Sequence, residues 1–211
     1  MICVFYTVPP TMKKYLRSKL HGYKLTIHDE QIQPKNIDPD TEILGVFVNS
    51  KIDKKIFTSL KKLKLIITLS TGYDHIDLKE AKKRKIPVCN VPAYGENTVA
   101  QYALTFILSI TRKFYRSIKQ VKEGFYNYEG LEGIDLKNKI IGIIGTGHIG
   151  MHLVDMLEGF DSKIIGYDKF PNKQLEEDHN FSYTSLDKLL KTSDIISLHV
   201  PLFPETYHMI S

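Results

Sequence analysis

The sequence predicts an α/β protein with two parallel-sheet domains, and three observations support this fold class. Apolar runs of strand length alternate with amphipathic stretches of helix length from the first residues onward. The alternation is interrupted at residues 90–95, where proline and glycine occur, and then resumes. A chain of 211 residues can form one large or two modest domains. Such alternation favours right-handed β-α-β units, so we expect each sheet to be parallel and covered by helices.

The first expected domain, residues 1–96, consists of strands joined by short helices. Strands are predicted at residues 2–6, 23–28, 43–48, 65–69 and 88–91, and helices at residues 11–20, 54–60 and 77–85. Cys3 and Cys89 each fall within a predicted strand, where a thiol behaves as a small buried hydrophobe. The two cysteines therefore indicate neither a disulfide framework nor a metal site.

The second expected domain, residues 97–211, begins with a long helix. Asn97 or Thr98 can cap this helix, which is predicted to run to about residue 123. Apolar positions recur along it at three- and four-residue steps, namely Val99, Tyr102, Ala103, Phe106, Ile107 and Ile110. Its length suits a helix that bridges two domains. Strands then follow at residues 139–144, 162–167, 181–183 and 194–198, with helices between them.

A glycine-rich turn follows the strand at residues 139–144, and this arrangement is typical of a dinucleotide-binding site. Gly145 permits a tight turn, Gly147 lets the backbone approach a pyrophosphate, and Gly150 allows close packing of helix against strand. The helix that follows directs its free N–H groups toward the phosphates. Asp168 comes 23 positions after Gly145, near the spacing expected for a carboxylate that binds the adenosine ribose. Its charge would repel a 2′-phosphate, so the sequence favours NAD over NADP.

A complete domain of this kind, the Rossmann fold, has six strands in the order 3-2-1-4-5-6. The chain stops soon after the fourth predicted strand, so we expect the Rossmann domain to be incomplete. The strand at residues 194–198 would then be left as an uncovered apolar edge.

Charge and hydropathy exclude several other classes of protein. The net charge of +5 and the basic clusters at residues 61–64 and 82–85 suggest nucleic-acid binding, but no reader motif accompanies them. Both clusters fall where predicted helices end, and cations there offset the helix dipole. No apolar run reaches the roughly 20 residues that span a bilayer. The amino-terminal apolar stretch is short and lacks a basic leader, so a cytoplasmic location is expected.

Four blocks of sequence, in order, resemble the D-isomer-specific 2-hydroxyacid dehydrogenases, with the D-lactate dehydrogenase branch nearest. These blocks are STGYDHID at residues 70–77, NVPAY at 90–94, GTGHIG at 145–150 and LHVPL at 198–202, continuing to residue 206. The resemblance covers essentially the whole chain. It implies a flavodoxin-like substrate domain over residues 1–96 and an NAD-binding domain over residues 97–211.

The resemblance also implies a substrate site in the first domain. Thr71, Gly72 and Tyr73 would form a loop whose backbone N–H groups bind the substrate carboxylate. Tyr94 would lie at the interdomain cleft and touch substrate. From the residues alone, an ordinary turn at the end of a strand is an equally good interpretation of residues 71–73. For Tyr94, a packed aromatic side chain with a hydrogen-bonded hydroxyl group is an equally good interpretation.

The cofactor residues implied by the resemblance extend beyond the glycines. His148 and Ile149 would meet the pyrophosphate through their backbone, and Thr146 belongs to the same turn. Val200, Pro201 and Thr206 would lie on the adenosine side of the cofactor, with Asp168 at the ribose. These assignments come from the family pattern and not from spacing.

The family's chemistry is hydride transfer between the nicotinamide and a 2-keto acid, assisted by an arginine and by a histidine paired with a glutamate. The positions of all three are expected beyond Ser211, so no catalytic residue is expected within this chain, and the chain alone is expected to be inactive. Its arginines all fall in predicted helices: Arg17, Arg84, Arg112 and Arg116. One departure occurs where many relatives carry Glu-His, because this sequence has Gln101-Tyr102.

The leading hypothesis is therefore an NAD-dependent oxidoreductase that interconverts a pyruvate-like 2-keto acid and its D-2-hydroxy acid. The alternative is a non-catalytic, corepressor-like protein that senses NAD(H). A homodimer is expected from the resemblance, with the helix after Asn97 and the loop at residues 126–128 as its surfaces. Neither a metal, a nucleic acid nor a membrane is expected as a partner.

Overall fold

The computed structural model describes residues 1–210 and separates into two compact units, Met1–Tyr94 and Gly95–Ser211. Each unit is built around its own parallel sheet. Among the described residues, no helix combines the length and the apolar character that crossing a membrane requires.

The first unit has a five-stranded sheet in the order β2-β1-β3-β4-β5. Its strands are β1 (Ile2–Tyr6), β2 (Lys24–His28), β3 (Ile43–Val46), β4 (Leu65–Thr68) and β5 (Val88–Cys89). Its helices are α1 (Pro10–Lys19), α2 (Lys54–Ser59) and α3 (Leu78–Lys83), with a 3-10 turn η1 (Pro34–Asn36). All pairings are parallel, and the order 2-1-3-4-5 is that of flavodoxin-like folds, as predicted.

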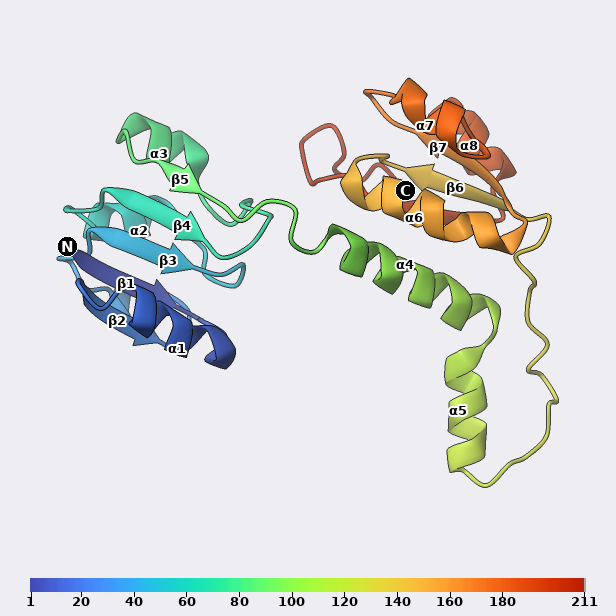
Figure 1. The fold of residues 1–211 in the computed structure, drawn as a ribbon, viewed down its shortest axis with the longest axis horizontal. Coiled ribbons are helices and arrows are strands. Elements are labelled where there is room, and N and C mark those ends of the chain that lie inside the picture. Colours follow the sequence, from blue (N-terminus) through green and yellow to red (C-terminus); the bar gives the residue numbers. More distant parts are fainter. Residues whose placement is uncertain (211) are drawn as a thin grey trace. The chain divides into compact units, whose positions relative to one another are not determined.

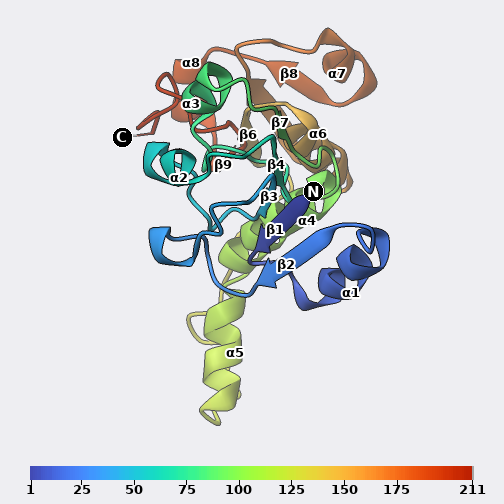
Figure 2. The same ribbon diagram turned by 90° about the vertical axis from the view of Figure 1, so that its left-hand side faces the viewer.

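Helices cover both faces of this sheet, because alternate residues of each strand point to opposite sides. Along β1, Val4 and Tyr6 join the core formed with α2 and α3, whereas Cys3 and Phe5 join the core formed with α1. Figures 1 and 2 show α1 on one face and α2 and α3 on the other. Asp53 starts α2 as its N-cap by accepting hydrogen bonds from backbone N–H groups in the first turn.

The predicted burial of both cysteines is wrong for one of them. Cys3 is buried in the central strand β1, and burial raises the pKa of its thiol. Cys89 is exposed, because β5 is an edge strand with a neighbour on one side only.

The second unit has a four-stranded parallel sheet in the order β8-β7-β6-β9. Its strands are β6 (Ile140–Ile144), β7 (Lys163–Tyr167), β8 (Phe181–Tyr183) and β9 (Ile195–Leu198). Its helices are α4 (Glu96–Thr111), α5 (Phe114–Lys122), α6 (His148–Leu157), α7 (Lys173–Asp178) and α8 (Leu186–Thr192), with a 3-10 turn η2 (Glu158–Phe160). In sequence order the strands lie 3-2-1-4, which is the first part of the Rossmann order.

The core of the second unit lies mainly between the sheet and two helices that run side by side, α4 and α6 (Figure 1). Ala100 and Ile107 of α4 and Leu153 and Leu157 of α6 are buried there. On the other face of the sheet, Leu189 of α8 is completely buried. Both faces of the sheet are therefore covered, as parallel sheets require.

The prediction of one long helix after residue 96 is wrong. The helix begins at Glu96, with Gly95 rather than Asn97 or Thr98 at the N-cap, and it ends at Thr111. Lys113 then adopts a left-handed conformation with φ of 51° before α5 begins. The backbone N–H of Ile134 donates to the carbonyl oxygen of Thr111 at 2.8 Å, so a returning segment takes the acceptor that the next helical turn would use.

Candidate functional site

The glycine turn joins β6 to α6 in the second unit. Gly145 adopts φ of +91°, a conformation that residues with a Cβ rarely take. Gly147 is the N-cap of α6, and no side chain caps this helix end. The first turn of α6 therefore presents backbone N–H groups, which suit an anion such as a phosphate.

The three glycines of the turn differ in what a side chain would meet. A Cβ on Gly145 would lie 2.8 Å from the carbonyl carbon of His199, and one on Gly150 would overlap the carbonyl oxygen of Gly145. A Cβ on Gly147 would meet nothing within 4 Å, and its φ of −66° is ordinary. Packing of the chain itself thus explains two glycines but not Gly147. The open space above Gly147 fits a group that approaches the backbone, as a dinucleotide pyrophosphate does.

Asp168 lies at this turn, because β6 and β7 are paired and both end there. Ile144 pairs with Tyr167, which brings the next residue of each strand together. Asp168 Oδ2 accepts a hydrogen bond from the backbone N–H of Thr146 at 2.7 Å, and Oδ1 accepts one from the N–H of Phe170 at 2.8 Å. The Thr146 hydroxyl group also lies 2.7 Å from Tyr183 Oη. The carboxylate is therefore held rigidly beside the glycine turn.

A cavity of about 320 Å³ opens beside the turn and the carboxylate. Six of the residues predicted to bind the cofactor line it: Gly145, Gly147, Asp168, Val200, Pro201 and Thr206. The Thr206 hydroxyl group donates to the carbonyl oxygen of Pro201 at 2.6 Å, which closes the loop that forms one wall. The remaining predicted residues do not line the cavity. Thr146 and Gly150 are buried, whereas His148 is exposed at the start of α6 and Ile149 is partly buried behind it.

Several residues that were not predicted from the sequence also line this cavity. They are Tyr167, Lys169, Phe170, His199, Phe203, Glu205 and Met209. Phe170 and Phe203 are 79% and 54% exposed, so both present large apolar surfaces to solvent. Phe170 follows the end of β7, and Phe203 follows the end of β9. These positions were a signal in the sequence for a binding site, because ligands of such sheets bind beyond the carboxyl ends of the strands.

The predicted substrate loop follows β4 in the first unit, and its carbonyl oxygens face the protein. Asn90 Nδ2 donates to the carbonyl oxygen of Thr71 at 2.9 Å, and the Ser70 hydroxyl group donates to that of Gly72 at 2.7 Å. The carbonyl oxygen of Tyr73 accepts from a backbone N–H at 3.0 Å. In a trans peptide the following N–H points opposite to the C=O, so the N–H groups of residues 72–74 point away from these partners.

The side chains around this loop are exposed. Tyr73 is 46% exposed and Tyr94, at the end of the first unit, is 62% exposed. The Thr71 hydroxyl group donates to the carbonyl oxygen of Val91 at 3.0 Å, which ties the loop to the segment after β5. An exposed loop with outward N–H groups can bind a carboxylate without any charged side chain of its own.

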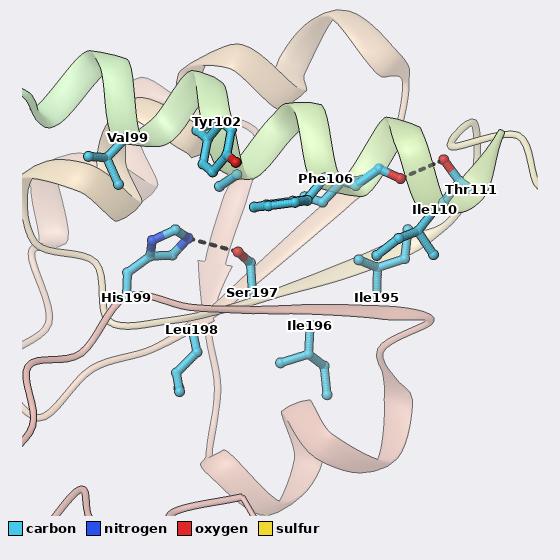
Figure 3. Close-up of a pocket in the computed structure, with 12 residues that line it drawn as sticks. Val99, Tyr102, Phe106, Ile110, Thr111, Ile195, Ile196, Ser197, Leu198 and His199 are labelled. Atoms are coloured by element: carbon cyan, nitrogen blue, oxygen red, sulfur yellow. Dashed lines mark hydrogen bonds between the residues drawn. The ribbon is translucent and has the colours of Figure 1, made fainter. Parts of the chain in front are cut away.

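A second hollow, of about 380 Å³, lies between α4 and β9 (Figure 3). Tyr102 and Phe106 project from α4 on one side, and Ile196 and Leu198 lie on β9, which is paired with β6 only. The uncovered apolar edge predicted for this strand is therefore observed within the described residues. His199 Nε2 lies 2.9 Å from Ser197 Oγ, and burial lowers the pKa of His199.

The basic and metal-ligating side chains give little further chemistry at these sites. Arg84 is occupied, because its guanidinium pairs with Glu80 at 2.7 Å and donates to the carbonyl oxygen of Phe57. Arg17, Arg112 and Arg116 lie on or next to α1, α4 and α5. Across residues 1–210, no three His, Cys, Asp or Glu side chains gather as a metal site.

A parallel sheet of order 3-2-1-4, a glycine turn at the end of its first strand and a carboxylate at the end of the next define a dinucleotide-binding α/β protein. Comparison with known proteins identifies the family. Residues 104–211 match the model for "D-isomer specific 2-hydroxyacid dehydrogenase, NAD binding domain". The chain belongs to this family, and its second unit contains the family's NAD-binding domain.

Individual relatives agree with this identification. A 2-hydroxyacid dehydrogenase homolog of Zymomonas mobilis is 39% identical over 196 residues, covering 90% of this chain and 59% of the relative. D-lactate dehydrogenase of Escherichia coli is 31% identical over 212 residues, covering 98% of this chain and 64% of the relative. These matches confirm the predicted family, and the match to the family's NAD-binding domain confirms the predicted cofactor.

Solved structures agree as well. D-lactate dehydrogenase from Aquifex aeolicus, complexed with NAD and lactic acid, matches with a TM-score of 0.90 and 34% identity, over 98% of this chain and 63% of that chain. The chain thus spans about three fifths of the length of the curated relatives that it matches.

Proposed function

We propose that this chain is part of an NAD-dependent oxidoreductase that interconverts a small, pyruvate-like 2-keto acid and its D-2-hydroxy acid. The observation that carries the proposal is the open space above Gly147 beside the fixed carboxylate of Asp168. When bound, NADH supplies the hydride for such a reaction. The residues of this chain hold the adenosine half of the cofactor and present amides to a carboxylate.

The turn and the acid would divide the recognition of NAD between them. The N–H groups of the first turn of α6, at residues 148–150, would bind the pyrophosphate, with Gly147 allowing its approach. Asp168 would accept hydrogen bonds from the ribose hydroxyl groups, and Val200, Pro201 and Thr206 would enclose the adenosine. The cavity that these residues line supports this arrangement.

Substrate recognition would rest on the loop in the first unit. The N–H groups of Gly72, Tyr73 and Asp74 point away from the protein's own acceptors, so they are available to the carboxylate of a 2-keto acid. The exposed ring of Tyr94 would contact the substrate at the same site. Names of the relatives, several of which are D-lactate dehydrogenases, favour a pyruvate-like substrate.

One experiment tests the cofactor assignment by removing a charge at the turn. In Asp168→Asn, the preference for NADH over NADPH should fall by about tenfold, because the repulsion of a 2′-phosphate is removed. Asp178→Asn is the matched control, since it removes the same charge from α7 of the same unit. Dissociation constants follow from isothermal titration or from amide chemical shifts where binding is weak. An unchanged preference in Asp168→Asn would contradict the assignment.

Turnover tests the reaction class. A longer protein that contains this chain should oxidise NADH in the presence of pyruvate, glyoxylate or hydroxypyruvate, whereas the 211-residue chain alone should turn over none of them. The residues from which an arginine, a histidine and a glutamate would act on the keto group are expected in the longer protein. NADH binding without turnover by the longer protein would favour the alternative, an NAD(H)-sensing protein that is not catalytic.

The proposal includes a cytoplasmic homodimer. The helix α5 has no buried residue, and Tyr126 and Tyr128 in the loop after it are each 84% exposed. Such apolar exposure is typical of an interface between subunits. Sedimentation should therefore show a dimer, and Tyr126→Ser with Tyr128→Ser should shift it toward monomer. A monomeric parent protein would contradict this part of the proposal.

A further inference from the structure

Two buried hydroxyl groups and a partly buried imidazole group form a chain directly beneath the predicted substrate loop. Thr68 is 0% exposed and Ser70 is 3% exposed. Thr68 Oγ1 lies 2.6 Å from Ser70 Oγ and 3.1 Å from His75 Nε2. The Ser70 hydroxyl group lies 2.7 Å from the carbonyl oxygen of Gly72. These contacts connect His75 to the backbone of the loop.

The direction of every hydrogen bond in this chain is fixed by its last acceptor. A carbonyl oxygen can only accept, so the single hydroxyl proton of Ser70 is donated to Gly72. Ser70 Oγ must then accept the proton of Thr68. Thr68 Oγ1 in turn must accept from His75, which places a proton on His75 Nε2. The remaining nitrogen, Nδ1, is buried and has no partner among residues 1–210.

The neutral form of His75 is the one that fits this environment. A proton on Nδ1 would create a buried N–H group without an acceptor, which costs free energy. Burial lowers the pKa of His75, and the neighbouring Asp74 carboxylate opposes this effect only in part. Thr68, which is hydrogen-bonded to the ring, and Ser70, which is hydrogen-bonded to Thr68, are both uncharged.

We propose that His75 is a positioning residue for the substrate loop, acting through Thr68 and Ser70 on the carbonyl group of Gly72. The inference rests on the proposed function, because it assumes that the loop binds the substrate carboxylate. Holding the Gly72 carbonyl oxygen inward keeps the N–H of Tyr73 outward, where a carboxylate can accept its hydrogen bond. The imidazole thus pre-organises the loop without touching substrate.

Nitrogen NMR tests the hydrogen-bond chain independently of function. In the ¹⁵N-labelled protein, His75 should be neutral with its proton on Nε2 at neutral pH. In Ser70→Ala the hydroxyl proton of Thr68 loses its acceptor, and the His75 ring signals should shift or broaden. A proton on Nδ1 in the parent protein would overturn the inference directly.

Pyruvate binding tests the positioning role. Amide shifts of Gly72 and Tyr73 should respond to pyruvate, and His75→Leu should weaken this response by about tenfold. His75→Gln, whose amide can donate in place of Nε2, should restore most of the affinity. His21→Gln is the matched control, since His21 is exposed in the turn that follows α1.

The outcomes separate the inference from the function on which it rests. If the parent protein responds to pyruvate and His75→Leu responds equally well, the positioning role is wrong and the substrate assignment stands. If the parent protein does not respond, the substrate role of the loop is wrong and the inference falls with it. Unchanged amide shifts in β1, β2 and α1 of the same unit show, for each variant, that the effect is local and not a loss of folding.

Discussion

Replacing glycines of the turn by alanine separates packing from cofactor binding. In Gly145→Ala, the positive φ of +91° costs about 1–2 kcal/mol in free energy, and a Cβ at 2.8 Å from the carbonyl carbon of His199 adds about 1–3 kcal/mol. The expected loss in the free energy of unfolding is therefore about 2–5 kcal/mol. In Gly147→Ala, the new Cβ meets nothing within 4 Å. Alanine is a weaker N-cap than glycine, which destabilises the fold by about 0.5–1 kcal/mol. Alanine also makes the unfolded chain less flexible, which stabilises the fold by about 0.5–1 kcal/mol, so the free energy of unfolding should barely change.

The two variants should behave in opposite ways in two assays. Urea unfolding followed by circular dichroism should show a clear loss for Gly145→Ala and none for Gly147→Ala. Titration with NAD, followed by amide shifts of Thr146 and Asp168, should show weakened binding for Gly147→Ala despite its intact fold. Equal loss of stability in both variants, or NAD binding by Gly147→Ala at the affinity of the parent, would refute the reasoning.

Three further predictions concern stability. Burial lowers the pKa of His75 and His199, so the unfolded chain binds more protons below pH of about 6.5, and the free energy of unfolding should fall as pH drops below that value. When His75 and His199 are both replaced by Gln, urea titrations should show that the free energy of unfolding depends less steeply on pH. An unchanged dependence would contradict the lowered pKa of the two histidines. Leu157→Ala should lower the free energy of unfolding by about 2–5 kcal/mol, because Leu157 is completely buried. Leu190→Ala, at an exposed position, should lower it by less than about 1 kcal/mol in the same urea titration. Equal losses in the two variants would argue against the core described. Lys113→Gly should be neutral or stabilising by up to about 1 kcal/mol, whereas Lys113→Val should destabilise, because φ is 51°; the reverse order in Tm would be inconsistent with this conformation.

Local pattern predicted the sheets and the position of the glycine turn well, because both depend on neighbouring residues. The strand β6, its glycines and the acid at the end of β7 follow each other in the chain, so their meeting is a matter of strand pairing alone. Asp168 accordingly lies where spacing placed it, within hydrogen-bond distance of Thr146.

Features that depend on distant residues could not be predicted in this way. The break after α4 requires Ile134 to bond to Thr111, and periodicity within a helix carries no information about that contact. Exposure of Cys89 depends on the order of strands in the sheet. The hydrogen-bond chain from His75 required knowledge that a turn folds back on β4, although polar residues at alternate positions 68 and 70 of an apolar run were a signal.

The cavity beside the glycine turn takes all its walls from residues 145–209, so one unit supplies the entire pocket. The walls that would contact a nucleotide there therefore all belong to the second unit. The affinity for the adenosine moiety and the affinity for the keto acid would then be set by different residues. Mutations could change one affinity without the other, and so change which of the two molecules binds first.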